Sequence, residues 1–149
     1  PMADGRVATR RYSIASDPAR RDAWEIAVLR EAHGSGGSEA VHRHYAVGLR
    51  IDVARPGNDF PLHEDARPAV LIAGGVGITP IRAMARALTD RGWPGRIHLV
   101  FSVRTPADVI FADELAYLAR RFPNLRLCVV ATRADDAWQG DRGRCAMPP

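Results

Sequence analysis

The chain contains no lysine, so all 21 of its basic residues are arginines, set against 17 aspartates and glutamates for a net charge of +4. A nucleic-acid-binding domain usually gathers its positive charge on one face or along one helix. Here the arginines are dispersed and interleaved with acidic residues, so the composition does not indicate a nucleic-acid partner.

Cysteines and long hydrophobic runs are also scarce. Cys128 and Cys145 are too few and too far apart for a metal site or a disulfide framework, and Cys128 lies in an apolar run that predicts a core position. No apolar run approaches the roughly 20 residues that span a bilayer, and the N-terminal residues lack the hydrophobic region of a signal peptide. We therefore expect a cytoplasmic protein without a metal or membrane contact.

With 149 residues, 46% hydrophobic and 26% charged, the chain has the composition of a globular protein of one ordinary domain or two small ones. Its first part predicts short β-strands at residues 9–16, 23–30 and 48–55, separated by turn residues. A glycine-rich loop and a short helix capped by Ser38 are expected between the last two strands. A loop at 55–68, rich in Pro, Gly and Asn, predicts a boundary that gives domains of residues 1–66 and 67–149.

The second part alternates buried strands with amphipathic helices. Strands are expected at residues 69–75, 96–103 and 125–133, and helices at 79–92 and 111–122. This order predicts an α/β fold whose parallel sheet has right-handed crossovers. The residues expected on the buried helical faces are Ile81, Met84, Ala85 and Leu88 in the first helix, and Leu115, Leu118 and Ala119, extended by Phe111 and Phe122, in the second.

The sharpest local signal is AGGVGITP at residues 73–80, where the first parallel strand meets a helix. Its glycines, Gly74, Gly75 and Gly77, permit a tight turn and a close backbone approach, while Thr79 is expected to cap the helix and Pro80 to suit its first turn. A helix N-terminus offers free N–H groups to a pyrophosphate. Because Pro80 replaces the third glycine of the Rossmann fingerprint, a plain strand-to-helix turn is the alternative.

Two other features carry weaker signals. The second glycine cluster, at residues 34–38, also precedes a short helix, where it is either a phosphate cradle or an ordinary flexible loop. His42 and His44 are two residues apart, a spacing that points them away from each other on a helix. They indicate a solvated surface rather than a metal site.

Together these motifs resemble the ferredoxin reductase-like flavoproteins, and within them the flavin reductase components of aromatic-ring oxygenases, of the phthalate dioxygenase reductase and vanillate demethylase reductase type. The family pattern Arg-x-Tyr-Ser is matched by Arg10, Tyr12 and Ser13. The flavin-phosphate loop is matched by GSGGS, the nucleotide loop by GGVGITP, and the stretch after the second parallel strand by SVRTPADVIFADEL. The resemblance implies a partial antiparallel β-barrel flavin domain followed by a parallel α/β nucleotide-binding domain.

The resemblance also implies roles for the flavin-side residues. Tyr12 would pack against the flavin ring, Ser13 would place its hydroxyl near the reactive flavin nitrogen, and Arg10 would pair with the flavin phosphate. Gly36, Gly37 and Ser38 would hold the same phosphate, which favours FMN over FAD.

On the nucleotide side, the resemblance places Thr79 where the nicotinamide meets the flavin, so that Ser13 and Thr79 are the implied catalytic residues. Hydride would pass from NADH or NADPH to the flavin, which would release electrons singly to an iron–sulfur protein or oxygenase component. Arg104, with Arg133 and Arg144, resembles arginines that bind the extra phosphate of NADPH. Asp108 or Asp135 could instead serve a ribose hydroxyl, and the resemblance leans slightly to NADH.

The chain departs from the family pattern at both ends. Only nine residues precede Arg10, and CAMPP stands where the family continues into another strand, so the nucleotide-binding domain is expected to lack its usual C-terminal strand. Open strand edges would favour self-association. The alternative to an NAD(P)H-dependent flavin oxidoreductase is a non-catalytic nucleotide-binding or assembly module.

Overall fold

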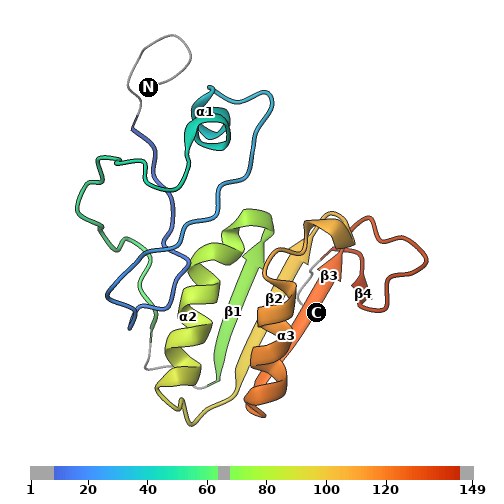
Figure 1. Ribbon diagram of the computed structural model, residues 1–149. Helices are drawn as coiled ribbons and strands as arrows, with labels where there is room; N and C mark the ends of the chain where they lie inside the picture. Colours follow the sequence, from blue (N-terminus) through green and yellow to red (C-terminus); the bar gives the residue numbers. More distant parts are fainter. Residues whose placement is uncertain (1–8, 64–67, 145–149) are drawn as a thin grey trace. The chain divides into compact units, whose positions relative to one another are not determined.

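The computed structural model describes residues 9–63 and 68–144, which fall into two compact units (Figure 1). The first unit comprises Pro1–Tyr12 and Ala27–Leu62, and the α/β unit comprises Ser13–Ile26 and His63–Pro149. The units do not follow chain order, because the early segment Ser13–Ile26 belongs to the α/β unit. The boundary predicted between residues 66 and 67 lies outside the described residues.

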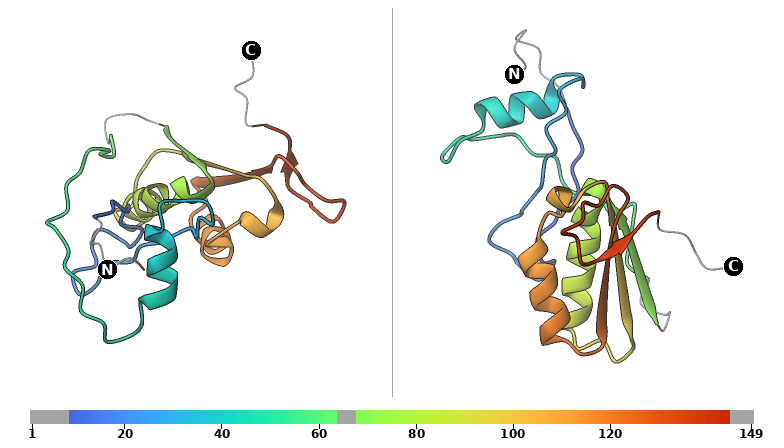
Figure 2. Two further views of the ribbon diagram at one scale, coloured as in Figure 1. Left: turned by 90° about the horizontal axis from the view of Figure 1, so that it is seen from above. Right: turned by 90° about the vertical axis from the view of Figure 1, so that its right-hand side faces the viewer.

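The α/β unit is built on a parallel sheet. Strands β1 (Ala69–Gly74), β2 (Ile97–Val103), β3 (Leu125–Ala131) and β4 (Asp141–Arg142) pair in that order. Helix α2 (Ile78–Asp90) connects β1 to β2, and α3 (Ala112–Arg121) connects β2 to β3. Both helices lie on one face of the sheet (Figures 1 and 2). The predicted parallel α/β fold is confirmed, and the two-residue β4 is an addition to it.

Burial in this unit follows the predicted periodicities. In β1, Leu71 and its alternate neighbours are buried, whereas Val70 and Ile72 are 59% and 57% exposed on the face that α2 and α3 do not cover. The buried faces of the helices are largely as predicted, with Ala119 only half-buried. The members that are buried are Ile81, Met84, Ala85, Leu88, Leu115 and Leu118.

Cys128 is half-buried, so its predicted core position is wrong. It pairs in register with Val100, which is also half-buried in the alternating pattern of β2. Its Sγ lies 2.9 Å from Asp141 Oδ2, a hydrogen bond that links β3 to β4. An apolar run identified the strand but not which of its faces the helices cover.

Helix α2 ends in a Schellman motif. The N–H of Gly92 donates to the carbonyl of Thr89 at 3.0 Å, and the N–H of Trp93 donates to the carbonyl of Leu88 at 2.9 Å. Gly92 has φ +66°, the left-handed conformation that glycine adopts without steric cost. The helix therefore stops two residues before the end predicted for it.

In the part of the first unit that the structure describes, there is one helix, α1 (Gly37–His44). In the described residues before β1, the three predicted strands do not form, and the β-structure is one isolated antiparallel bridge between Ile14 and Ile26. Leu49, Ile51 and Val53 of the third predicted strand remain 48–61% exposed. Sequence alternation alone cannot form a strand, because its N–H and C=O groups need a neighbouring strand. The antiparallel barrel predicted for residues 1–66 is therefore not confirmed.

Candidate functional site

The turn between β1 and α2 has the conformation that its glycines predict. Gly75 has φ +50° and opens a single 3₁₀ turn, Gly75–Gly77, that leads directly into α2. A Cβ added to Gly74, Gly75 or Gly77 would meet no atom within 4 Å. The first turn of α2 contains no acidic residue. The N–H of Ile78, the first residue of the helix, donates to the carbonyls of Gly75 and Val76 of the 3₁₀ turn. The start of this 13-residue helix thus combines open space beside the glycine turn with the positive end of the helix dipole.

Thr79 does not cap α2, which corrects the prediction made from its position. Gly77 is the N-cap and makes no side-chain capping bond, while Thr79 lies inside the helix. Its buried hydroxyl donates to the carbonyl of Val76 at 3.0 Å, so it fastens the helix to the turn before it. Pro80 is the third residue of the helix, within the first turn as predicted, where a missing N–H breaks no helical hydrogen bond.

Arg104 follows β2 and is exposed. Its Nε lies 3.8 Å from Asp108 Oδ2. Asp108 closes a capping box with Thr105, and the backbone and side-chain hydrogen bonds from Thr105, with the charge of Arg104, lower the pKa of the Asp108 carboxyl. This carboxylate therefore stays ionised and lies beside Arg104 at the carboxyl end of the sheet.

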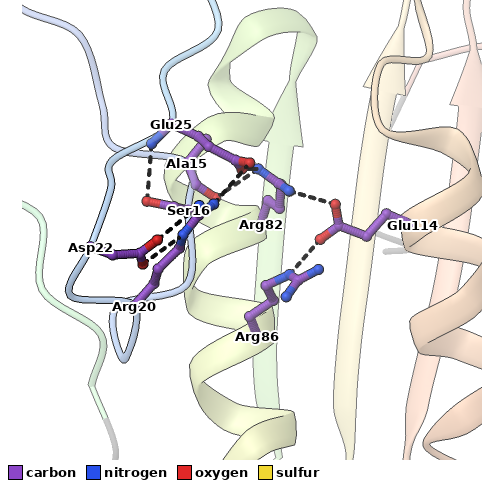
Figure 3. Close-up of polar contacts among 8 residues, drawn as sticks. All are labelled: Ala15, Ser16, Arg20, Asp22, Glu25, Arg82, Arg86 and Glu114. Atoms are coloured by element: carbon purple, nitrogen blue, oxygen red, sulfur yellow. Dashed lines mark hydrogen bonds and ion pairs between the residues drawn. The ribbon is translucent and has the colours of Figure 1, made fainter.

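A buried arginine in α2 organises the polar contacts of the α/β unit (Figure 3). Arg82, whose side chain is 8% exposed, donates through Nη1 to Glu25 Oε2 at 2.8 Å and to the carbonyl of Ala15 at 3.0 Å. On its other side it pairs with Glu114 of α3 at 2.6 Å, and Arg86 also donates to Glu114, at 2.6 Å. The chain of alternating charges thus links the segment Ser13–Ile26, α2 and α3.

Two pKa shifts report on this network. Burial opposes the charged form of Arg82, but the hydrogen bonds that it donates to Glu114 and Glu25 outweigh burial and raise the pKa of the guanidinium. Burial likewise opposes ionisation of Glu114, but hydrogen bonds from Arg82 and Arg86 outweigh it and lower the pKa of the carboxyl. The buried charges therefore stabilise one another.

The guanidinium of Arg82 also lies over the ring of Phe111, 4.3 Å from its centroid. Phe111 precedes α3 as its N-cap with φ +59°, an unfavourable backbone conformation for a residue with a Cβ. The cation–π contact keeps this strained residue packed on α2.

In the first unit, the structure brings Arg10 to the glycine-rich loop. Its Nη2 donates to Ser35 Oγ at 2.7 Å, and a Cβ on Gly37 would come within 2.6 Å of its Nε. Gly37 thus allows the guanidinium to lie against the start of α1. Gly36 is the N-cap with φ +83°.

Ser38 does not cap α1, because it is the second residue of the helix and its Oγ accepts from the N–H of Glu31 at 3.1 Å. His42, predicted to be solvated, is exposed, and its Nε2 lies 2.7 Å from the carbonyl of Val28. No three potential ligands gather into a metal site among residues 9–63 and 68–144. None of the helices described there is long and apolar enough to cross a membrane.

Tyr12 and Ser13 are the two residues between which the chain passes from the first unit into the α/β unit. Tyr12 is half-buried and closes the early part of the first unit, while Ser13 is exposed and begins the segment of the α/β unit that Arg82 contacts. Of the predicted residues, those of the glycine turn lie together in the α/β unit, and Arg10 and Gly37 lie together in the first. Sequence reasoning gave no individual role to Ser35 or to Arg82. Ser35 lay within the quoted loop, but nothing in the sequence singled out Arg82.

The model of the oxidoreductase NAD-binding domain matches residues 71–147, and the chain belongs to this family. The resemblance to oxygenase reductases is also confirmed.

The chain is 42% identical over 118 residues to the reductase subunit of tert-butanol monooxygenase / tert-amyl alcohol desaturase from Aquincola tertiaricarbonis, a match covering 79% of this chain and 34% of that one. It is 35% identical over 148 residues to the glycine betaine monooxygenase reductase subunit of Chromohalobacter salexigens, a match covering 97% of this chain and 40% of that one. The chain therefore spans well under half the length of these relatives.

Among solved structures, the chain resembles phthalate dioxygenase reductase, described as a modular structure for electron transfer from pyridine nucleotides to [2Fe-2S]. The TM-score is 0.73 at 28% identity, and the match covers 91% of this chain and 48% of that one.

Proposed function

We propose that this chain is the flavin- and nucleotide-handling part of a reductase that passes hydride from NAD(P)H to a bound flavin and then electrons, one at a time, to an iron–sulfur or oxygenase partner. The observation that carries the proposal is the left-handed turn at Gly75, which opens onto the N-terminus of α2 in a chain of the NAD-binding family. The names of its relatives, reductase subunits of oxygenase systems, support the choice of partner.

The residues around this turn fit a dinucleotide. Open space beside Gly74, Gly75 and Gly77 would admit a pyrophosphate to the glycine turn and the positive end of the helix dipole, and no acidic side chain in the first turn would repel it. Thr79, held by its bond to Val76, would fix the shape of the turn beside the nicotinamide. These residues would bind and orient the nucleotide.

The first unit offers a fit to a flavin phosphate. Arg10 supplies a guanidinium fork, Ser35 and Ser38 supply hydroxyls, and Gly37 keeps the start of α1 clear enough for Arg10 to lie against it. We propose FMN rather than FAD, as the resemblance of the GSGGS loop implies. Bound flavin would convert two-electron into one-electron transfer.

Tyr12 and Ser13 would act on the flavin ring. The aromatic face of Tyr12 would stack on it, and the hydroxyl of exposed Ser13 would donate a hydrogen bond to it. For the nucleotide we propose a slight preference for NADH. Asp108 lies close enough to Arg104 to offset part of the charge that would attract the extra phosphate of NADPH.

Self-association is a further part of the proposal. Within the described residues β1 is an edge strand of the sheet, and Val70 and Ile72 expose apolar surface beside that edge. Sedimentation velocity should reveal concentration-dependent oligomers, whereas a monomer at all concentrations would contradict this part alone.

The central test is a cofactor-loading experiment. Purified chain is incubated with FMN or FAD and desalted, its visible spectrum is recorded, and NADH or NADPH is added under anaerobic conditions. We expect a yellow protein that the nucleotide bleaches. A chain that binds NAD(P)H but stays colourless would support a non-catalytic nucleotide-binding module instead.

A further inference from the structure

Arg82 occupies an unusual position for an arginine in an amphipathic helix. It lies in the second turn of α2, and its side chain is 8% exposed, although arginine is rarely buried this deeply without partners. Its partners come from three directions: the segment Ser13–Ile26, the opening of α3 at Phe111, and Glu114. All of these groups belong to the α/β unit.

The segment Ser13–Ile26 is closed on itself by short-range contacts. Ile14 bridges Ile26, the N–H of Ala15 donates to the carbonyl of Glu25 at 2.8 Å, and the N–H of Glu25 donates to Ser16 Oγ at 3.2 Å. Ala15 and Ser16 are buried at 0% and 2% exposure. The segment is thus a small closed loop, and the guanidinium of Arg82 binds it near both ends, at Ala15 and at Glu25 (Figure 3).

We propose that Arg82 is a positioning residue for Ser13. By fixing the carbonyl of Ala15, two residues beyond Ser13, to the helix that begins at the glycine turn, Arg82 determines where Ser13 lies relative to that turn. The inference rests on the proposed function, in which the Ser13 hydroxyl meets the flavin and the turn holds the nucleotide. Arg82 itself touches neither cofactor.

The chemistry of the contacts accounts for the choice of arginine. One nitrogen, Nη1, serves both Ala15 and Glu25, while Nε and Nη2 serve Glu114, so that the planar fork holds partners on two sides at once. A lysine ammonium presents three donors from a single point and cannot span these partners in the same way. Arg82→Lys should therefore retain the charge but only part of the positioning.

Arg86 provides a matched control. It lies one turn further along α2 and donates to the same carboxylate, Glu114, but its hydrogen bond reaches α3 rather than the segment Ser13–Ile26. Arg86→Gln thus removes a charge and an ion pair from the same network. If Arg82→Gln acted only by weakening the fold, Arg86→Gln should lower the rate of FMN reduction to a similar extent.

The first measurement is the anaerobic rate of FMN reduction at saturating NADH, with nucleotide affinity measured separately. We expect Arg82→Gln to reduce the rate by roughly tenfold to a hundredfold, as for a small misplacement of a reacting group, with nucleotide affinity within about threefold of wild type. Glu25 is half-exposed, so the Glu25→Gln variant should fold readily, and it should also lower the rate of FMN reduction. Arg86→Gln should leave it near wild type.

A double-mutant cycle distinguishes positioning from a general effect. If Arg82 acts through Ser13, Arg82→Gln should have little further effect on the rate in a Ser13→Ala background. Independent, multiplicative effects would overturn the proposal, as would an Arg82→Gln rate equal to that of wild type.

Amide hydrogen exchange without any cofactor supplies a readout independent of turnover. The N–H groups of Ala15 and Glu25 should exchange faster in Arg82→Gln than in Arg86→Gln, and equal exchange would overturn the anchoring. A wild-type chain that binds NADH but does not reduce FMN would instead overturn the proposed function and, with it, the role of Arg82 in the reaction. The two failures are therefore distinguishable.

Discussion

The backbone N–H of Arg133 donates a 2.7 Å hydrogen bond to the carbonyl of Arg104. These arginines follow the neighbouring parallel strands β3 and β2, so the sheet itself brings their backbones together at its carboxyl edge. Ligands of open α/β sheets bind at this edge.

Loss of either arginine should affect NADPH more than NADH. We expect Arg104→Gln or Arg133→Gln to weaken NADPH binding about tenfold, the loss of one charge-assisted hydrogen bond of roughly 1.5 kcal/mol, with a smaller change for NADH. Arg126→Gln, at the start of β3, is the control for net charge. Titration with both nucleotides checks this, and equal losses for the two would contradict it.

Gly75 and Gly92 form a matched pair at the two ends of α2, with φ +50° and +66° and no atom within 4 Å of an added Cβ. Alanine at either position should cost about 1–2 kcal/mol of stability, because both need left-handed backbone. We expect only Gly75→Ala also to weaken nucleotide binding, by at least about tenfold, since its methyl group would enter the space assigned to the pyrophosphate. Equal affinities of the two variants would argue against the turn as the binding site.

Arg10 and Arg11 are adjacent, but Arg10 is the one that reaches Ser35. Arg10→Gln should weaken FMN binding by about ten- to a hundredfold, because a guanidinium–phosphate contact is lost. Arg11→Gln removes the same charge one residue along and should have little effect. Fluorescence titration of FMN measures both, and a comparable loss in Arg11→Gln would indicate non-specific attraction instead.

Glu114 should make the α/β unit sensitive to acid. Because its folded-state pKa is lowered, its contribution to stability is present above its ordinary pKa of 4.5 and is lost as pH falls through the lower folded value. Glu114→Gln should lower the free energy of unfolding by roughly 2–3 kcal/mol at pH 7, since it leaves two arginines without a shared carboxylate. The variant should then lose less stability than the wild type as the pH falls. Urea unfolding from pH 7 downward tests this, with Asp113→Asn in the same helical turn as the control.

Asp90 should have the opposite effect. Burial, with the charge and hydrogen bond of Asp17, raises the pKa of Asp90 above its ordinary 3.8. The raised pKa gives a contribution to stability that is present below the ordinary pKa and is lost as pH rises through the folded-state pKa. At neutral pH the ionised Asp90 carboxylate is therefore destabilising. Asp90→Asn should raise stability at pH 7 by up to about 1 kcal/mol, limited by solvent screening, and the gain should vanish near pH 4. A gain that persists in acid would rule out this electrostatic origin.

The parts of the fold that the sequence predicted are those governed by local pattern. The strands around Leu71, Leu99 and Leu127 and the buried faces of α2 and α3 follow from periodicity, and the turn at Gly75 follows from glycine spacing. Each of these features depends on residues that are close together in the sequence. They could therefore be predicted from the sequence without knowledge of any tertiary contact.

The remainder depends on contacts between distant residues. Arg82 resembles any polar residue of an amphipathic helix, and its partners Glu25 and Glu114 lie 57 and 32 positions away. No spacing rule connects them, so neither its burial nor the membership of Ser13–Ile26 in the α/β unit could be anticipated. The strand predicted at 48–55 fails for the related reason that alternation does not supply a pairing partner.

The left-handed residue that opens α3 has a consequence for how this region loses its structure. Phe111 holds an unfavourable backbone angle, and the same guanidinium that covers its ring also binds Glu114 one turn later. Release of that guanidinium would free the ring, relax the backbone and unpair the carboxylate in a single event. The first turn of α3 should therefore melt together with its attachment to α2, as one cooperative step rather than by gradual fraying.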